Sequence, residues 1–144
     1  MAFKLVLRAT QQIDFLTNRL FEVEYRPMTL NDKTLKDELD SADILYLPIK
    51  FTVPDFYLYS LSTKMVGYLG GSGAILYHGP ANSAACKRLM AHRAAAVCST
   101  LNADELAGAI ANVLRQKQEL SANAKLIALN EFSMESIRKQ FWQQ

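Results

Sequence analysis

Two short, uninterrupted apolar segments constrain the fold of this chain more than any other feature. Ile44–Leu47 and Ala74–Tyr77 contain only aliphatic and tyrosine side chains, and Pro48 and Gly79 follow them closely. Such runs are typical of strands that are buried on both faces of a parallel sheet. Three further strand candidates accompany them, namely Phe3–Leu7, Phe21–Tyr25 and Ala94–Cys98.

Segments with the apolar spacing of helices separate these strand candidates. The clearest is Asn102–Leu114, whose first residue can cap the helix and whose apolar side chains recur on one face. The other expected helices are residues 11–20, a segment from Asn31 or Asp32 to Leu39, and residues 62–70, 83–92, 121–130 and 133–144. Ile49–Leu61, rich in aromatic residues, is expected to be a loop. Strands that alternate with helices predict an α/β fold, in which helices cover both faces of an open parallel sheet.

Length and composition indicate the class of protein. The 144 residues suit a single domain, 1–144, with its terminal helices from about residue 121. A net charge of only +2 is too small to argue for a nucleic-acid partner, and none is expected. No apolar run approaches the roughly 20 residues of a membrane helix, and the N-terminal apolar stretch is too short for a signal peptide. Cys86 and Cys98 lack metal-binding spacing, so a cytoplasmic protein with reduced thiols, no metal site and no cofactor is expected.

The stretch from Ser62 to Pro80 is the strongest candidate for a binding site. It holds five of the six glycines, and the longer segment 56–103 contains no aspartate or glutamate. Thr63 and Lys64 stand with Ser62 at the start of an expected helix, where free N–H groups and the helix dipole favour an anion. A lysine there, without carboxylates nearby, predicts a phosphate-like ligand. The alternative is that Lys64 is an ordinary solvated surface lysine.

Four segments in order resemble the C-terminal domain of GT-B glycosyltransferases of the retaining, group 1 type, which binds the nucleotide-sugar donor. They are SADILYLP at 41–48, TKMVGYLGGSGAILYHGP at 63–80, NADELAGAIANVL at 102–114 and FSMESIRKQF at 132–141. The resemblance covers roughly residues 20–142. It implies a Rossmann-like sheet, half of a GT-B fold.

The resemblance also implies roles for individual residues. Lys64 matches the lysine that contacts the donor diphosphate and stabilises the leaving nucleotide. Ser62 and Thr63 can add hydroxyl or amide donors. His78 and Gly79 correspond to the position beside the sugar or phosphate.

The expected nucleoside site departs from the family pattern. The turn from Arg26 to Met28 lies where the base usually docks against backbone groups. The family often has two glutamates eight residues apart, the second on the ribose, but Tyr59 and Gly67 hold these positions here. Ribose binding at Gly67 is therefore expected to be different, water-mediated or absent.

As a whole, the resemblance implies a donor-binding domain for polysaccharide or glycoconjugate synthesis, with a UDP-sugar as the favoured ligand. The family's N-terminal acceptor-binding domain, the other wall of the reaction cleft, has no counterpart in this sequence and is the implied partner. The chain is thus expected to be a fragment or a short version without transfer activity of its own. Peripheral membrane contact in a full protein is compatible with the resemblance.

Two other functions are compatible with the sequence. One is a non-catalytic interaction module that keeps the fold without donor binding, with Phe141 and Trp142 of the last expected helix at the contact. The other is a small flavodoxin-like regulatory domain. Such a domain would carry acidic residues at its strand ends, whereas Pro48 holds the expected phosphoacceptor position.

Overall fold

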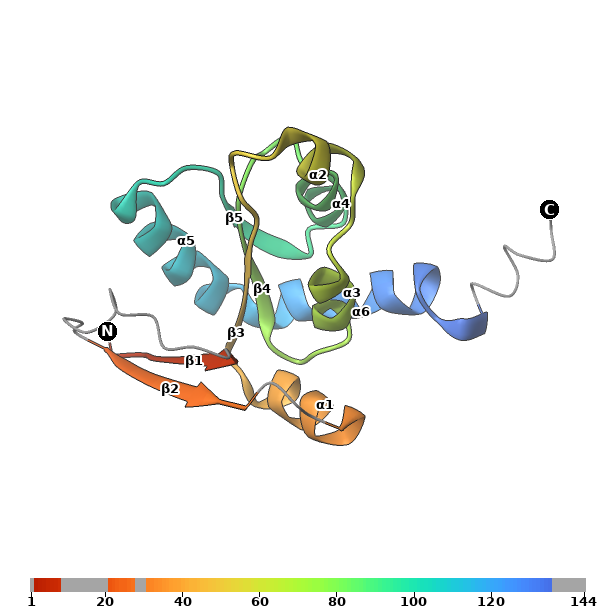
Figure 1. Cartoon of the computed structure of the whole chain (residues 1–144). Helices are drawn as coiled ribbons and strands as arrows, with labels where there is room; N and C mark the ends of the chain where they lie inside the picture. Colours follow the sequence, from red (N-terminus) through yellow and green to blue (C-terminus); the bar gives the residue numbers. More distant parts are fainter. Residues whose placement is uncertain (1, 9–20, 28–30, 136–144) are drawn as a thin grey trace, which may run out of the picture. The chain divides into compact units, whose positions relative to one another are not determined.

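The computed structural model describes residues 2–8, 21–27 and 31–135 (Figure 1). Contacts within the chain divide it into two compact units, Met1–Leu35 and Lys36–Gln144. The boundary falls inside α1 (Asp32–Ser41), which contributes to both. The single domain expected over residues 1–144 stays a prediction.

The first unit contains two short parallel strands, β1 (Lys4–Arg8) and β2 (Glu22–Arg26). The Glu24 carboxylate lies 2.7 Å from Lys4 Nζ and 2.6 Å from Arg26 Nε. Hydrogen bonds from Arg26 and Lys4 lower the pKa of Glu24 to about 2. Charged side chains on both strands therefore support the pairing.

The second unit is built on three parallel strands in the order β3-β4-β5, which are β3 (Ile44–Pro48), β4 (Ala74–His78) and β5 (Ala95–Cys98). Leu45 pairs with Ile75, and Ile75 pairs in turn with Ala95. Every residue of β4 is buried, as expected of a central strand that is covered on both faces. The α/β fold with parallel strands is therefore confirmed.

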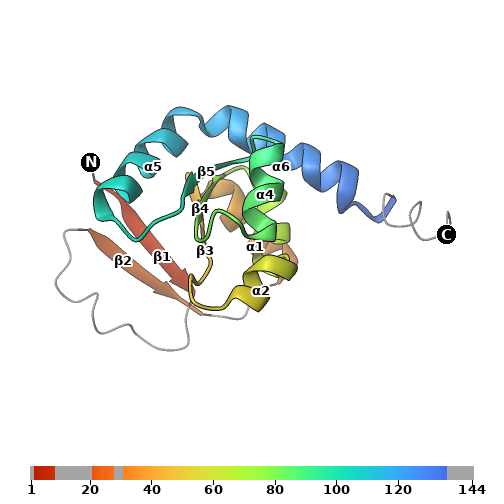
Figure 2. The same ribbon diagram turned by 90° about the horizontal axis from the view of Figure 1, so that it is seen from above.

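Helices pack on both faces of this sheet (Figure 2). They are α3 (Thr63–Leu69), α4 (Ala84–Ala91), α5 (Ala103–Arg115) and α6 (Lys117–Glu131), whereas α2 (Pro54–Tyr59) contacts α4. Alternate side chains of a strand point to opposite faces. Ile75 and Tyr77 accordingly pack with side chains of α3 and α4, whereas Leu76 and Ala96 pack with side chains of α5.

Helix α6 belongs to both of these hydrophobic clusters. Leu120, near its start, packs in the cluster that contains Val113 of α5. Ala124 and Ile127, further along, pack in the cluster that contains Leu89 of α4. A single helix thus contributes to the core on each face of the sheet.

The glycine-rich turn 70–73 joins α3 to the amino-terminal end of β4. A Cβ on Gly73 would lie 2.7 Å from the Ala42 carbonyl oxygen and 2.9 Å from Leu45 Cγ. A Cβ on Gly71 would lie 3.0 Å from Leu45 Cδ1. Close packing therefore explains two glycines of this turn, which lies at the opposite end of β4 from the expected ligand site.

The loop expected over residues 49–61 is wrong, because α2 occupies its middle. Pro54 stands at the first helical position, where its missing N–H has no cost, and Asp55 in the first turn complements the helix dipole. No residue of α2 is buried, and its six residues are too few to show a helical repeat of apolar side chains.

The other expected elements of the second unit agree with the structure to within a few residues, and α6 begins at Lys117 rather than at 121. The helix expected over 11–20 lies outside the described residues, as do residues 136–144 of the last expected helix, including Phe141 and Trp142. None of the helices in the described part of the chain is both long and apolar enough to cross a membrane.

Candidate functional site

The carboxyl-terminal ends of β3, β4 and β5 form the edge at which a parallel α/β sheet usually binds its ligand. The chain leaves the sheet there after residues 48, 78 and 98. The Ile49 N–H donates to the His78 carbonyl oxygen at 2.8 Å, and the Gly79 N–H donates to the Cys98 carbonyl oxygen at 3.1 Å. These bonds continue the strand ladder and hold the three exits side by side.

His78 lies at the centre of this edge with both ring nitrogens in hydrogen bonds. Its Nε2 is 2.6 Å from the carbonyl oxygen of Thr100, and its Nδ1 is 2.8 Å from the hydroxyl oxygen of Tyr46. Because a carbonyl oxygen can only accept, Nε2 carries the proton, and in neutral His78 the Tyr46 hydroxyl donates to Nδ1. The Cys98 thiol also donates to the Thr100 carbonyl, and Phe51 packs edge-on against the imidazole at 5.9 Å between centroids.

His78 therefore has no ring nitrogen free for a ligand in this arrangement. The residue is buried, whereas Tyr46 is 38% exposed and is the partner that a ligand could displace. Partial burial raises the pKa of the Tyr46 hydroxyl. The role of His78 beside the sugar stays a prediction, and its hydrogen bonds join β4 to β3 and to the loop after β5.

Gly79 is required by close packing at the same edge. A Cβ on this residue would lie 2.8 Å from Ile49 Cβ and 2.8 Å from the hydroxyl oxygen of Tyr77. That hydroxyl donates to the Pro80 carbonyl oxygen at 2.8 Å and accepts from Ser83, the N-cap residue of α4. Burial raises the pKa of Tyr77 to about 12. The turn after β4 is consequently fixed by buried hydrogen bonds.

The start of α3 differs from the start of α5, which follows β5 directly. Asn102 caps α5 with its side chain, and two carboxylates lie in the first turn of that helix. In α3, Ser62 forms no side-chain cap and the first turn has no acidic residue. Thr63 and Lys64 are exposed, and Lys64 makes no ion pair with another described residue. An anion could therefore meet a free cation and uncapped N–H groups at α3.

The remaining expected site residues are spread more widely. Gly67 is exposed on α3, and a Cβ there would meet no atom within 4 Å. Tyr59, at the end of α2, is 81% exposed. Arg26 belongs to the first unit, where it pairs with Glu24, and Met28 lies outside the described residues. The structure thus groups the expected residues of α3, and separately those that follow β4.

Sequence reasoning misses Tyr46, Phe51 and Thr100, which surround His78. A partial signal exists for the first two, because they are aromatic residues on either side of Pro48 at the end of an expected strand. Thr100 takes part through its backbone carbonyl, which no pattern of side chains reveals.

Among residues 2–8, 21–27 and 31–135, no three histidine, cysteine, aspartate or glutamate side chains gather as a metal site requires. No protein-family model matches this chain, and no curated protein matches its sequence. The function must therefore be inferred from the residues themselves.

Proposed function

We propose that this chain is the donor-binding domain of a glycosyltransferase that uses a nucleotide diphosphate sugar in polysaccharide or glycoconjugate synthesis. Lys64, with Ser62 and Thr63 beside it, contacts the diphosphate. The observation that carries this function is the combination of an exposed lysine without a partner among the described residues and an uncapped helix start in a parallel α/β unit.

The charges of the segment 56–103 support an anionic ligand at this position. Arg88 and Arg93 already form ion pairs with Glu131 and Glu119. The Lys64 ammonium keeps its three donors for solvent or a ligand. A diphosphate oxygen would form a charge-assisted hydrogen bond there, which is stronger than a neutral one.

The arrangement of elements also supports the proposal. The segments that resemble the donor-binding family coincide with β3, with α3 and β4, and with α5. Because β3 and β4 are parallel, the helix between them runs back along the sheet, and its start lies toward the carboxyl-terminal edge. Lys64, in the first turn of α3, therefore lies nearer to the carboxyl-terminal edge of the sheet than the end of that helix does.

His78 and Gly79 act as positioning residues in this proposal. The bonds of His78 to Tyr46 and Thr100 fix the turn that follows β4. Gly79 lets that turn approach Ile49 closely. A sugar or phosphate would then meet a preformed wall of backbone rather than a mobile side chain.

The contribution of this chain to the reaction is stabilisation of the leaving nucleotide. When the bond to the sugar breaks, negative charge grows on the diphosphate, and Lys64 is placed to offset it. Transfer also requires an acceptor in attack geometry, which we assign to a partner acceptor-binding domain. We expect no sugar transfer by the 144-residue chain alone.

Donor binding is tested by NMR titration of the ¹⁵N-labelled chain with UDP, GDP and ADP at millimolar concentration. We expect a Kd of about 0.1–1 mM, because one wall of a cleft offers few contacts against the entropic cost of association. Shifts should concentrate at Ser62–Lys64 and at Gly79. Lys64→Ala should weaken binding about tenfold or more, the value of a charge-assisted hydrogen bond.

A matched control is Lys87→Ala, which removes an exposed lysine of the same carboxylate-free segment from α4. It should leave nucleotide affinity unchanged. Titrations without shifts near Lys64 would exclude donor binding. A lower melting temperature with unchanged affinity in Lys64→Ala would instead assign this lysine a structural role.

A second candidate function is a non-catalytic interaction module. The exposed aromatic residues of α2 favour it, since Phe56 is 51% exposed and Tyr59 is 81% exposed. Aromatic side chains are enriched at the centres of protein interfaces. Failure of all three nucleotides in the titration above, with an intact fold, would favour this function over donor binding.

A further inference from the structure

Strand β5 pairs with β4 alone among the described residues, so its other side is a free sheet edge. The Cys98 carbonyl points to β4, because it accepts from the Gly79 N–H at 3.1 Å. Backbone groups alternate in direction along a strand, so Ala96 also faces β4, whereas Ala95 and Val97 turn their N–H and C=O groups away from it. No described residue forms a hydrogen bond with these outward groups.

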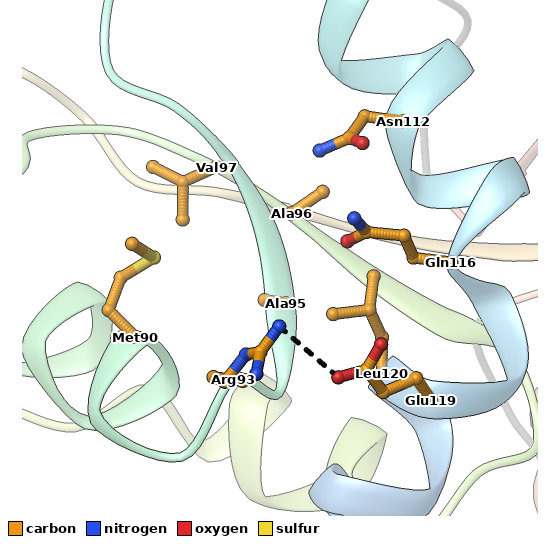
Figure 3. Close-up of a pocket in the computed structure, with 9 residues that line it drawn as sticks. All are labelled: Met90, Arg93, Ala95, Ala96, Val97, Asn112, Gln116, Glu119 and Leu120. Carbon is orange, nitrogen blue, oxygen red and sulfur yellow. Dashed lines mark ion pairs between the residues drawn. The ribbon is translucent and has the colours of Figure 1, made fainter.

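A groove of about 290 Å³ runs along this free edge (Figure 3). Met90 and Val97 line it on the side of α4, and Asn112 and Gln116 line it on the side of α5. The strand itself is recessed, since Ala95 is only 7% exposed while Met90 is 54% exposed. The groove thus has one apolar wall and one wall with amide side chains. At its base lie the backbone N–H and C=O groups of β5 that form no hydrogen bond with a described residue.

Arg93 stands at one end of the groove in a backbone conformation that favours glycine. Its φ is 52°, the left-handed region. The Arg93 N–H bonds to the Met90 carbonyl, and the Ala94 N–H bonds to the Leu89 carbonyl. These two bonds form a Schellman motif at the end of α4. Arg93 occupies the left-handed position of this motif, which is usually a glycine. Such a non-glycine residue is a backbone outlier of the kind that gathers at functional sites.

The residues that line the groove carry one positive and one negative charge, on Arg93 and Glu119, and Arg115 beside Asn112 adds a second positive charge. The Arg93 side chain is 76% exposed, and one of its nitrogens lies 3.4 Å from the Glu119 carboxylate, which leaves most of its N–H donors free (Figure 3). On the polar wall, Arg115 donates to the side chain of Asn112 at 3.1 Å. Two arginines and one glutamate give this surface a net positive charge, which complements an acidic ligand.

We propose that this groove binds an extended acidic peptide segment of a partner protein by adding it as a strand to β5. Free backbone groups supply hydrogen bonds to any extended chain, and the two walls receive its alternating side chains. Apolar residues of the peptide contact Met90 and Val97. Its acidic residues face Arg115 and the end of the groove at Arg93. The recess favours a single extended segment over the edge strand of a second copy of the chain, because Ala95 at its base is buried between α4 and α5.

The probe is a capped peptide of alternating valine and glutamate, added to the full ¹⁵N-labelled chain. Its addition should slow amide hydrogen exchange at Ala95 and Val97, which face the groove. Exchange at Ala96 and Cys98 should not change, because their N–H groups already bond to β4. This alternation between neighbouring residues distinguishes strand addition from binding to a side chain nearby.

Two variants and one control peptide test the chemistry. Arg93→Gly should keep the fold, because glycine suits the left-handed conformation, and should weaken binding about two- to fivefold, the value of an exposed ion pair. Val97→Pro removes an outward N–H without touching the ladder to β4 and should abolish binding. The peptide in which lysine replaces glutamate should bind more weakly than the acidic one.

Three results would overturn the inference. The first is the absence of protection at Ala95 and Val97 at millimolar peptide. The second is equal binding of the lysine and glutamate peptides, which would exclude an acidic partner. The third is protection of these amides without peptide, together with a dimer in sedimentation, which would make a second copy of the chain the occupant.

Discussion

The hydroxyl of Tyr46 lies 2.8 Å from Nδ1 of His78 and joins β3 to β4 at the carboxyl-terminal edge of the sheet. Neither residue is a neighbour of the other in the sequence, so the bond depends on the register in which Pro48 pairs with His78. The pair is part of the wall against which we propose that a donor sugar lies.

Tyr46→Phe removes this bond and leaves Nδ1 of a buried imidazole without its partner. We expect a loss of about 1–3 kcal/mol in the free energy of unfolding, the cost of a buried acceptor left without a hydrogen bond. Chemical denaturation measures it, with Tyr59→Phe as the control because Tyr59 is 81% exposed. Equal stabilities of the two variants would mean that solvent replaces the Tyr46 hydroxyl without cost.

The glycine-rich turn allows a sharper comparison between neighbouring residues. Gly73→Ala places a Cβ 2.7 Å from the Ala42 carbonyl oxygen and should destabilise the fold by about 1–3 kcal/mol, as overpacking of a core does. A Cβ on Gly70 would meet nothing within 4 Å, so Gly70→Ala should be neutral or slightly stabilising. Melting temperatures of both variants check this. A stable Gly73→Ala protein would contradict the close packing of the turn.

Gly67 lies inside α3 with open space around its Cα. Gly67→Ala should therefore stabilise the unit by about 0.5–1 kcal/mol, the difference in helix propensity. If the ribose of a donor lies over α3, the same substitution should weaken UDP binding. Thermal unfolding and UDP titration of one variant separate the two effects, and a gain in stability with unchanged affinity would place the ribose elsewhere.

The stability of the pairing between β1 and β2 should fall at acidic pH. The pKa of Glu24 is lowered from its usual 4.5 to about 2 in the folded chain by Arg26 and Lys4. The unfolded carboxyl takes up its proton first, so this contribution to stability is complete above pH 4.5 and is lost as the pH falls toward 2. Amide exchange in β1 and β2 against pH measures it. Glu24→Gln should flatten the profile, whereas Glu22→Gln should retain it.

Much of the second unit is predictable from the sequence because its strands are locally distinct. The apolar runs 44–47 and 74–77 become β3 and β4. Asn102 caps α5 as its position before the amphipathic segment indicates. Such features depend on residues close together in the chain. By contrast, α2 has only six residues, too few for a helical repeat of apolar side chains to indicate it.

The candidate site is less predictable because it depends on distant contacts. A glycine-rich segment is typical of phosphate-binding turns. Gly71 and Gly73, however, are explained by their close packing against Leu45 of β3, in the turn before β4 and away from the carboxyl-terminal edge of the sheet. The hydrogen bonds of His78 involve residues 32 and 22 positions away. The groove beside β5 is lined by Arg93, whose left-handed conformation its residue type does not favour.

Helix α6 contributes Leu120 to the hydrophobic cluster on one face of the sheet and Ile127 to the cluster on the other face. We therefore expect the helix layers on the two faces to unfold together rather than one after the other. Release of this helix exposes apolar side chains on both faces of the sheet, so partially unfolded forms with only one intact layer should be rare. The slowest-exchanging amides of α4 and α5 should then report the same opening free energy. A substitution in one layer would thereby change the lifetime of the folded state in the other.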